Sequence, residues 1–264
     1  MIVALIDNGS LEPAAHRNLR TVAAELSSRT GVNVRAVSWK HSDRIPDDQL
    51  DDTPAWTLQA FVRSLVALGQ RDFVFVPFFI SPQGAIGSAL RNDLETLRRE
   101  LGEFEFTFSA GLAAQGVIPK IVAERIRACI STNSLHAPPV LVVDHGGPSA
   151  QSAELRDQLV AEIRVALAGL TGPVAAASME GAHPPLLADQ LTNSAFAGRD
   201  VVVAPLFLSP GRHAGPQGDL AQICRTVHSR GHLTELVGTH PLVVDALAGA
   251  LRTTLSHHQA HSFA

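Results

Sequence analysis

The sequence predicts an α/β fold of two tandem (βα)4 domains, each a mainly parallel sheet flanked by helices. Three observations lead to this prediction. Short apolar runs alternate with longer amphipathic segments along the whole chain. The apolar runs are continuous, as is typical of strands buried on both faces of a parallel sheet. The strand ends and glycines of the first half recur in the same order in the second half, which indicates a duplication.

Each half pairs four expected strands with four expected helices. In the first half, strands at 2–6, 32–39, 73–79 and 104–110 precede helices near 12–30, 54–69, 86–101 and 117–131. In the second half, strands at 140–145, 173–179, 200–207 and 232–238 precede helices near 150–169, 185–195, 217–229 and 241–255. The polar, proline-rich stretch "NSLHAPP" interrupts the pattern. We therefore expect domains at 1–133 and 139–256, a joint at 134–138, and a histidine-containing tail at 257–264 that is disordered by default.

Three local alignments support the duplication. "VALIDNGS" matches "VLVVDHGG", "AVSWK" matches "AASME", and "PFFISP" matches "PLFLSP", at offsets of 137, 140 and 128 residues. They pair Asp7 with Asp144 and Ser38 with Ser178. The smaller third offset indicates extra residues in the first half, and the acidic stretch at 46–55 is the expected surface-loop insertion.

Composition excludes several classes of protein. The chain has 264 residues, 45% of them hydrophobic, and a net charge of -4, which argues against a nucleic-acid partner. Cys129 and Cys224 belong to no CxxC pair, so we expect two buried thiols. The start of the chain lacks a signal-peptide pattern, and no stretch reaches the roughly 20 apolar residues of a membrane helix. We expect a cytoplasmic protein without a membrane partner.

Ligand-type side chains follow three strands of the second half. His145 follows the first strand, Glu180 the second, and His213 lies in the turn after the third. The carboxyl ends of parallel strands meet at one edge of the sheet, so these side chains can converge. Two imidazole nitrogens and a carboxylate oxygen suit a divalent first-row metal such as Fe(II), Co(II), Ni(II) or Zn(II). Imidazole also exchanges protons near neutral pH.

The first half has Asn8, Lys40 and Ala85 at the three corresponding positions. Taken singly, a histidine at a strand end such as His145 or His213 is more often a hydrogen-bonded structural residue than a metal ligand. A glutamate in a turn is usually just solvated. Their joint absence from a copy that keeps the strand ends and glycines favours a function. The duplicated fold has therefore kept this chemistry in one half.

Other polar residues receive simpler interpretations. Helix capping is the default role of Asp219, and we interpret His16 and His232 as surface residues. The stretch "GRHAGPQGD" fits no nucleotide fingerprint, although its backbone N–H groups and Arg212 could bind an anion. The chain has no GxGxxG after a strand, P-loop, HExxH or GxSxG motif, so we expect no organic cofactor.

The stretches "LVVDHGGPS" and "PLFLSPGRHAGPQGDL" resemble the class II tetrapyrrole chelatases, which include sirohydrochlorin cobaltochelatases and ferrochelatases. The resemblance implies chelatase-like α/β domains and ATP-independent insertion of Co2+, Fe2+ or Ni2+, as a substrate, into sirohydrochlorin or a related tetrapyrrole. Such a reaction belongs to siroheme or cobalamin biosynthesis. The resemblance also implies catalytic His145 and His213, a metal site of these two with Glu180, and substrate contacts at Arg212, Gly146, Ser209 and Gly211.

Two departures from the family pattern leave alternatives open. The family usually has alanine before the first histidine and Gly-Ser after it, where this chain has Asp144 and then Gly146-Gly147. Many two-domain relatives also keep active-site histidines in the first half. The alternatives are a non-catalytic tetrapyrrole- or metal-binding protein derived from a chelatase, a ferrochelatase for a later porphyrin, and an α/β protein whose histidines are structural. We expect a monomer in which the fused halves imitate a dimer, with a larger oligomer as the alternative.

Overall fold

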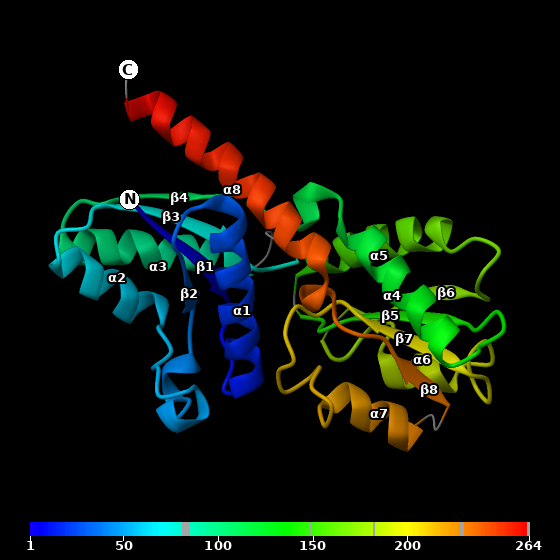
Figure 1. The fold of residues 1–264 in the computed structure, drawn as a ribbon. Coiled ribbons are helices and arrows are strands. Elements are labelled where there is room, and N and C mark those ends of the chain that lie inside the picture. Colours follow the sequence, from blue (N-terminus) through cyan, green and yellow to red (C-terminus); the bar gives the residue numbers. More distant parts are fainter. Residues whose placement is uncertain (81–84, 148, 182, 228–229, 263–264) are drawn as a thin grey trace. The chain divides into compact units, whose positions relative to one another are not determined.

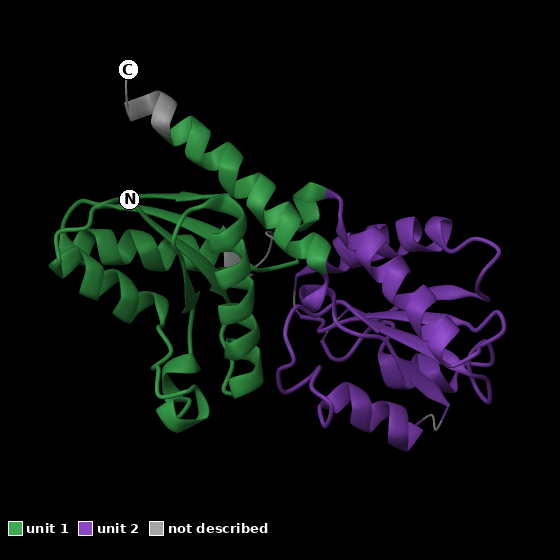
Figure 2. Ribbon diagram, viewed as in Figure 1, with its two compact units in different colours: residues 1–115, 241–264 green, residues 116–240 purple. Residues whose placement is uncertain are grey.

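The chain forms two four-stranded parallel sheets with helices on both faces, as the sequence predicts (Figure 1). The structure is a computed structural model, and it describes residues 1–80, 85–147, 149–181, 183–227 and 230–262. All eight expected strands and eight expected helices are present within these residues. By packing, the chain divides into two compact units: unit 1 comprises residues 1–115 and 241–264, and unit 2 comprises residues 116–240 (Figure 2).

The sheet of unit 1 has the strand order β2-β1-β3-β4. Its strands are β1 Ile2–Asp7, β2 Val34–Ser38, β3 Asp72–Pro77 and β4 Glu105–Phe108. Its helices are α1 Pro13–Thr30, α2 Leu58–Ala67, α3 Ala85–Leu101 and α8 Pro241–Ser262. Alternate residues of β1 and β3 face opposite ways, and those such as Ile6 and Phe75 pack against α2 and α3.

The sheet of unit 2 repeats this topology with the order β6-β5-β7-β8. Its strands are β5 Val140–Asp144, β6 Val174–Ser178, β7 Val201–Pro205 and β8 Gly231–Leu233. Its helices are α4 Ile118–Thr132, α5 Ala150–Ala166, α6 Leu187–Thr192 and α7 Asp219–Val227. Strand residues such as Leu141 and Val203 pack against α6 and α7.

The two units do not coincide with the sequence halves 1–133 and 139–256. The last helix of each half is exchanged, so that α4 belongs to unit 2 and α8 to unit 1. Helix α4 packs on α5 and β7, and α8 packs on α1. As packing units, the boundaries therefore fall after residues 115 and 240. As limits of the sequence repeat, residues 133 and 139 stay a prediction.

Two segments are more ordered than the sequence indicates. The expected tail at 257–264 continues α8 as far as Ser262, and Nε2 of His258 lies 2.9 Å from Oδ2 of Asp72. The expected surface insertion at 46–55 buries Leu50 completely in a small cluster with Ile45 and Ala55. Local polar and apolar contacts explain both differences, because each gives the segment something to pack against.

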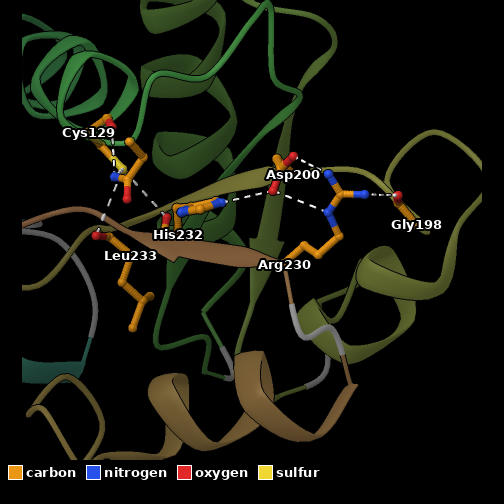
Figure 3. Close-up of polar contacts among 7 residues, drawn as sticks. Cys129, Gly198, Asp200, Arg230, His232 and Leu233 are labelled. Carbon is orange, nitrogen blue, oxygen red and sulfur yellow. Dashed lines mark hydrogen bonds and ion pairs between the residues drawn. The ribbon is translucent and has the colours of Figure 1, made fainter.

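Polar contacts fasten α4 and the amino ends of β7 and β8 together in unit 2 (Figure 3). Asp200 accepts hydrogen bonds from Arg230 and lies 3.1 Å from Nε2 of His232, and these two bonds lower the pKa of its carboxyl. The thiol of Cys129 on α4 faces the carbonyls of His232 and Leu233 at 3.9 and 4.0 Å. His232 is thus a paired, half-buried residue, contrary to the surface position expected for it.

The two cysteines are free and buried, as expected. Burial raises the pKa of both thiols, and that of Cys224 reaches about 11. Neither is therefore poised as a nucleophile. In the part of the chain that the structure describes, we find no helix with the length and apolar character needed to cross a membrane.

Candidate functional site

The site predicted from the sequence forms at the carboxyl edge of the unit 2 sheet. Strand β5, which leads into His145, lies between β6 and β7. Glu180 follows β6 and His213 lies in the loop after β7, so both neighbours of the central strand contribute a side chain. Strand order thus explains how residues far apart in the sequence meet at His145.

The two histidines point their Nε2 atoms at each other. These nitrogens are 3.1 Å apart, and the ring planes are inclined at 82°. Metal–nitrogen bonds of about 2.0–2.1 Å place two nitrogens bound to one ion roughly 3 Å apart. The observed spacing therefore suits two ligands of a single ion, and it equally suits a proton shared between two imidazoles.

Asp219 fixes the orientation of His213. Its Oδ2 lies 2.8 Å from Nδ1 of His213, so this nitrogen carries the proton and donates it to the carboxylate. Nε2 of His213 is then left with its lone pair facing His145. The sequence predicted only helix capping for Asp219, which is the first residue of α7. The backbone also ties the loop to this helix, because the N–H of Leu220 donates to the His213 carbonyl at 3.1 Å.

Glu180 lies at the rim of the site. Its Oε1 is 3.5 Å from Nε2 of His145, and its side chain is 65% exposed. Across the described ranges, no three His, Cys, Asp or Glu side chains are already arranged as a metal site. The structure thus brings the two histidines together and places the carboxylate beside one of them.

Glycines allow the loops after β5 and β6 to touch. The N–H of Glu180 donates to the His145 carbonyl at 3.2 Å. Gly146 has φ +83°, and a Cβ atom there would lie only 1.8 Å from the Glu180 carbonyl oxygen. Gly181 is similarly close to Gly147, since its Cβ would lie 2.7 Å from that residue's nitrogen. Any larger residue at Gly146 would push the two loops apart.

A buried polar chain lies beneath the His145 loop. Asp144 and Ser178 are register neighbours in β5 and β6, and the Ser178 hydroxyl donates to Oδ1 of Asp144 at 2.5 Å. Nη1 of Arg156, on α5, donates to the same hydroxyl, and the Arg156 side chain is 3% exposed. Burial raises the pKa of Asp144, whereas the Ser178 hydrogen bond and the charge of Arg156 oppose this rise.

Unit 1 repeats the framework without the ligand-type side chains. The N–H of Lys40 donates to the Asn8 carbonyl at 3.3 Å, which matches the contact between Glu180 and His145. Gly9 has φ +86° and abuts Lys40 as Gly146 abuts Glu180. Ala85 begins α3, and residues 81–84 before it lie outside the described residues.

His16 is buried, so its assignment to the surface is wrong. It is 1% exposed, and its Nδ1 lies 3.3 Å from the Ser38 hydroxyl. Burial lowers the pKa of His16 to about 4 and raises that of the neighbouring Asp7 to about 6. The position belongs to the apolar stripe of α1, together with Ala15 and Leu19, and this stripe is the sequence signal for its burial.

The predicted substrate contacts lie in the same region but differ in availability. The Arg212 side chain is 79% exposed, and its Nε is 3.9 Å from Asp219. The N–H of Gly211 already donates to the Ser209 carbonyl at 2.9 Å. The N–H of Gly146 donates to the Asp144 carboxylate. Arg212 is therefore the predicted contact whose polar group is most open to solvent.

The two tandem parallel-sheet units have the architecture of the two-domain class II chelatases, as the resemblance implied. The CbiX family matches residues 2–129 and 139–254, and the chain belongs to this family. The two matched ranges correspond to the two halves of the sequence. A search of curated proteins found no match.

Solved structures with the same fold cover nearly the whole chain. SirB from Bacillus subtilis with Fe3+ aligns over 98% of both chains at 12% identity and a TM-score of 0.70. SirB from Bacillus subtilis subspecies spizizenii in complex with cobalt aligns over 98% of both at 14% identity and a TM-score of 0.67. CbiX, the terminal enzyme for biosynthesis of siroheme in denitrifying bacteria, covers 96% of this chain and 97% of its own at 17% identity and a TM-score of 0.65. At these identities the likeness is one of fold.

Proposed function

We propose that this protein is a chelatase that inserts Co2+, Fe2+ or Ni2+ into sirohydrochlorin or a related tetrapyrrole without ATP. The observation that carries the proposal is the 3.1 Å approach of the His145 and His213 Nε2 atoms at the carboxyl edge of the unit 2 sheet. Membership of the CbiX family and the fold shared with sirohydrochlorin chelatases support it. A cytoplasmic location and a role in siroheme or cobalamin biosynthesis belong to the same proposal.

The two histidines suit the proton balance of metal insertion. A divalent ion that enters a tetrapyrrole displaces two N–H protons from the ring, so the products are the metallated ring and two protons. Imidazole nitrogens bind first-row divalent metals, and they also accept protons. His145 and His213 first hold the ion through their Nε2 lone pairs. When the ion passes to the ring nitrogens, the same lone pairs become free to accept the two protons.

Neighbouring residues prepare this pair for exchange. Asp219 keeps the proton of His213 on Nδ1 and therefore directs the Nε2 lone pair at the ion. Glu180, 3.5 Å from His145 Nε2, supplies a carboxylate oxygen to the ion or relays protons to solvent. The exposed guanidinium of Arg212 contacts a carboxylate of the macrocycle. Gly146, Ser209 and Gly211 shape the surface on which the ring lies.

Anaerobic absorbance spectroscopy tests the proposal. Sirohydrochlorin is mixed with Co2+, Fe2+ or Ni2+, with and without the protein, and the initial rate of the spectral change is measured. We expect insertion above the protein-free rate for at least one metal, and the fastest metal indicates the pathway. A bound-pigment spectrum without any acceleration would instead support a non-catalytic tetrapyrrole-binding protein. If the protein accelerated insertion only into a later porphyrin, that porphyrin would be the substrate in place of sirohydrochlorin.

A further inference from the structure

The carboxyl edge of unit 2 has a feature that the metal chemistry itself does not use: a chain of contacts that runs from α5 to the imidazole of His145. This series of contacts begins at Arg156, whose Nε and Nη2 each lie 2.9 Å from Oδ1 of the adjacent Asp157. Its Nη1 donates to the Ser178 hydroxyl and reaches the His183 carbonyl at 3.5 Å. The guanidinium is therefore held from several sides.

The second part of this series of contacts joins Ser178 to the His145 loop. The Ser178 hydroxyl accepts from Arg156 and donates to the Asp144 carboxylate. This carboxylate in turn accepts the N–H of Gly146. The Gly146 carbonyl oxygen lies 3.2 Å from Nδ1 of His145. Each contact thus fixes the next, and the last one orients the imidazole with its Nε2 toward His213.

Unit 1 offers an internal comparison for this chain of contacts. Asp7 and Ser38 stand where Asp144 and Ser178 stand, and His16 lies 140 residues before Arg156, the same offset as between the two serines. His16 contacts the Ser38 hydroxyl, so the second-half arrangement is repeated with an imidazole in place of the guanidinium. At this position, a permanent positive charge is present in the unit that carries the facing histidines and is replaced by the His16 imidazole in unit 1.

We propose that Arg156, acting through Ser178 and Asp144, is a positioning residue that sets the orientation of the His145 imidazole. This inference rests on the proposed function for its catalytic consequence. Asp144 takes the place where the family pattern usually has alanine, so the device depends on this chain's own residues. A buried arginine remains charged at all working pH values, and its planar donors fit a fixed hydroxyl and carbonyl.

The test compares matched serine variants in the two units of the full-length protein. Ser178→Ala removes the hydroxyl between Arg156 and Asp144, and Ser38→Ala removes its counterpart in unit 1. Both hydroxyls are buried, so the two changes cost similar stability, which thermal unfolding measures. Arg156→Met and the double variant Arg156→Met/Asp144→Asn extend the series, the latter without an unpaired buried carboxylate.

Two readouts separate orientation from general stability. The first is the imidazole 15N–1H correlation of His145 in histidine-labelled protein, assigned with His145→Gln, which reports orientation and tautomer without any turnover. The second is kcat and KM for metal insertion. We expect Ser178→Ala to shift the His145 resonances and lower kcat about 10- to 100-fold, the range for residues that orient metal ligands. Ser38→Ala should leave both unchanged.

Either of two results would overturn the proposal. In the first, Ser178→Ala remains folded and leaves the His145 resonances in place. In the second, Ser38→Ala shifts these resonances and lowers kcat as much as Ser178→Ala does. If wild-type protein inserts no metal into any tetrapyrrole, the proposed function fails, but the His145 resonances still decide whether Arg156 and Ser178 position the imidazole.

Discussion

Asp219 provides a prediction whose size follows from a single contact. Its Oδ2 lies 2.8 Å from Nδ1 of His213, and this bond keeps the proton of the imidazole away from the nitrogen that faces His145. Asp219→Ala removes the acceptor and frees the ring to change tautomer or rotate. Asp219→Asn keeps an oxygen acceptor but removes the negative charge. The two variants therefore separate orientation from charge.

The expected magnitude comes from the strength of the bond and from its exposure. A hydrogen bond to a charged group contributes about 1.5–3 kcal/mol. The side chains of His213 and Asp219 are 28% and 37% exposed, so solvent screening favours the lower end of this range. Since about 1.4 kcal/mol corresponds to a factor of ten, Asp219→Ala should lower kcat about tenfold. Asp219→Asn should lower it only about threefold, because half of the interaction, its geometry, is kept.

The anaerobic insertion assay measures these rates, and a matched variant controls for the helix. Asp219 begins α7, so its removal also takes a carboxylate from a helix N-terminus, where it is stabilising. Asp189 occupies the first turn of α6 and makes Asp189→Ala the control, with kcat expected to remain unchanged. The reasoning is refuted if Asp219→Ala keeps kcat within twofold of wild type, or if Asp219→Asn is as impaired as Asp219→Ala.

Two further predictions concern stability. Asp7 has its pKa raised from 3.8 to about 6, so its contribution to stability is full below pH 3.8 and is lost as the pH rises through 6, a change of about 3 kcal/mol. His16, with a pKa lowered from 6.5 to about 4, contributes in the opposite direction, because its stabilisation increases as the pH rises from 4 to 6.5. We therefore expect the stability of Asp7→Asn, relative to wild type, to increase from pH 4 to 7. Urea unfolding that gave parallel profiles for the two proteins would contradict this. Gly146→Ala forces a Cβ to 1.8 Å from the Glu180 carbonyl, whereas Gly198→Ala at φ +70° meets nothing within 4 Å. The first should lower the free energy of unfolding by more than 3 kcal/mol and the second by about 1 kcal/mol, and equal losses would show that φ alone matters.

The sequence predicts the fold well because the central strands are continuous apolar runs that are easily recognised. The runs at 140–143 and 201–205 are continuous and apolar, and the central positions of β5 and β7 in the sheet require this. The last strand is less well predicted. The apolar pattern suggested 232–238, yet β8 ends at Leu233, and a short 3-10 turn occupies Val237–Thr239.

The exchange of α4 and α8 could not be predicted from local patterns. An amphipathic helix shows that it has an apolar face, but it does not identify the sheet that covers this face. Helix α4 buries residues such as Ile121 and Ile126 in unit 2, although it is the next α-helix in the sequence after β4 of unit 1. Only the packing of α4 on α5 and β7 in three dimensions assigns this helix to unit 2.

The meeting of His145, His213 and Glu180 was predictable, but the residues that support them were not. Strand ends of a parallel sheet share an edge, and this rule brings the three together. Arg156 nevertheless gave a signal, because it falls on the apolar stripe of α5 with Leu159, Val160 and Ile163. A charged residue on such a stripe indicates a buried polar partner. Asp219 gave a weaker signal, since carboxylates are common at helix starts.

The most direct test of the central claim compares His145→Ala with Asn8→Ala in the insertion assay. The two residues occupy corresponding positions after β5 and β1, so the substitutions differ mainly in the chemistry that they remove. The account predicts that His145→Ala, like His213→Ala, reduces insertion to the protein-free rate, while Asn8→Ala retains the wild-type rate. Wild-type rates in both histidine variants, or an equal loss in Asn8→Ala, would contradict a metal-insertion site at the carboxyl edge of unit 2.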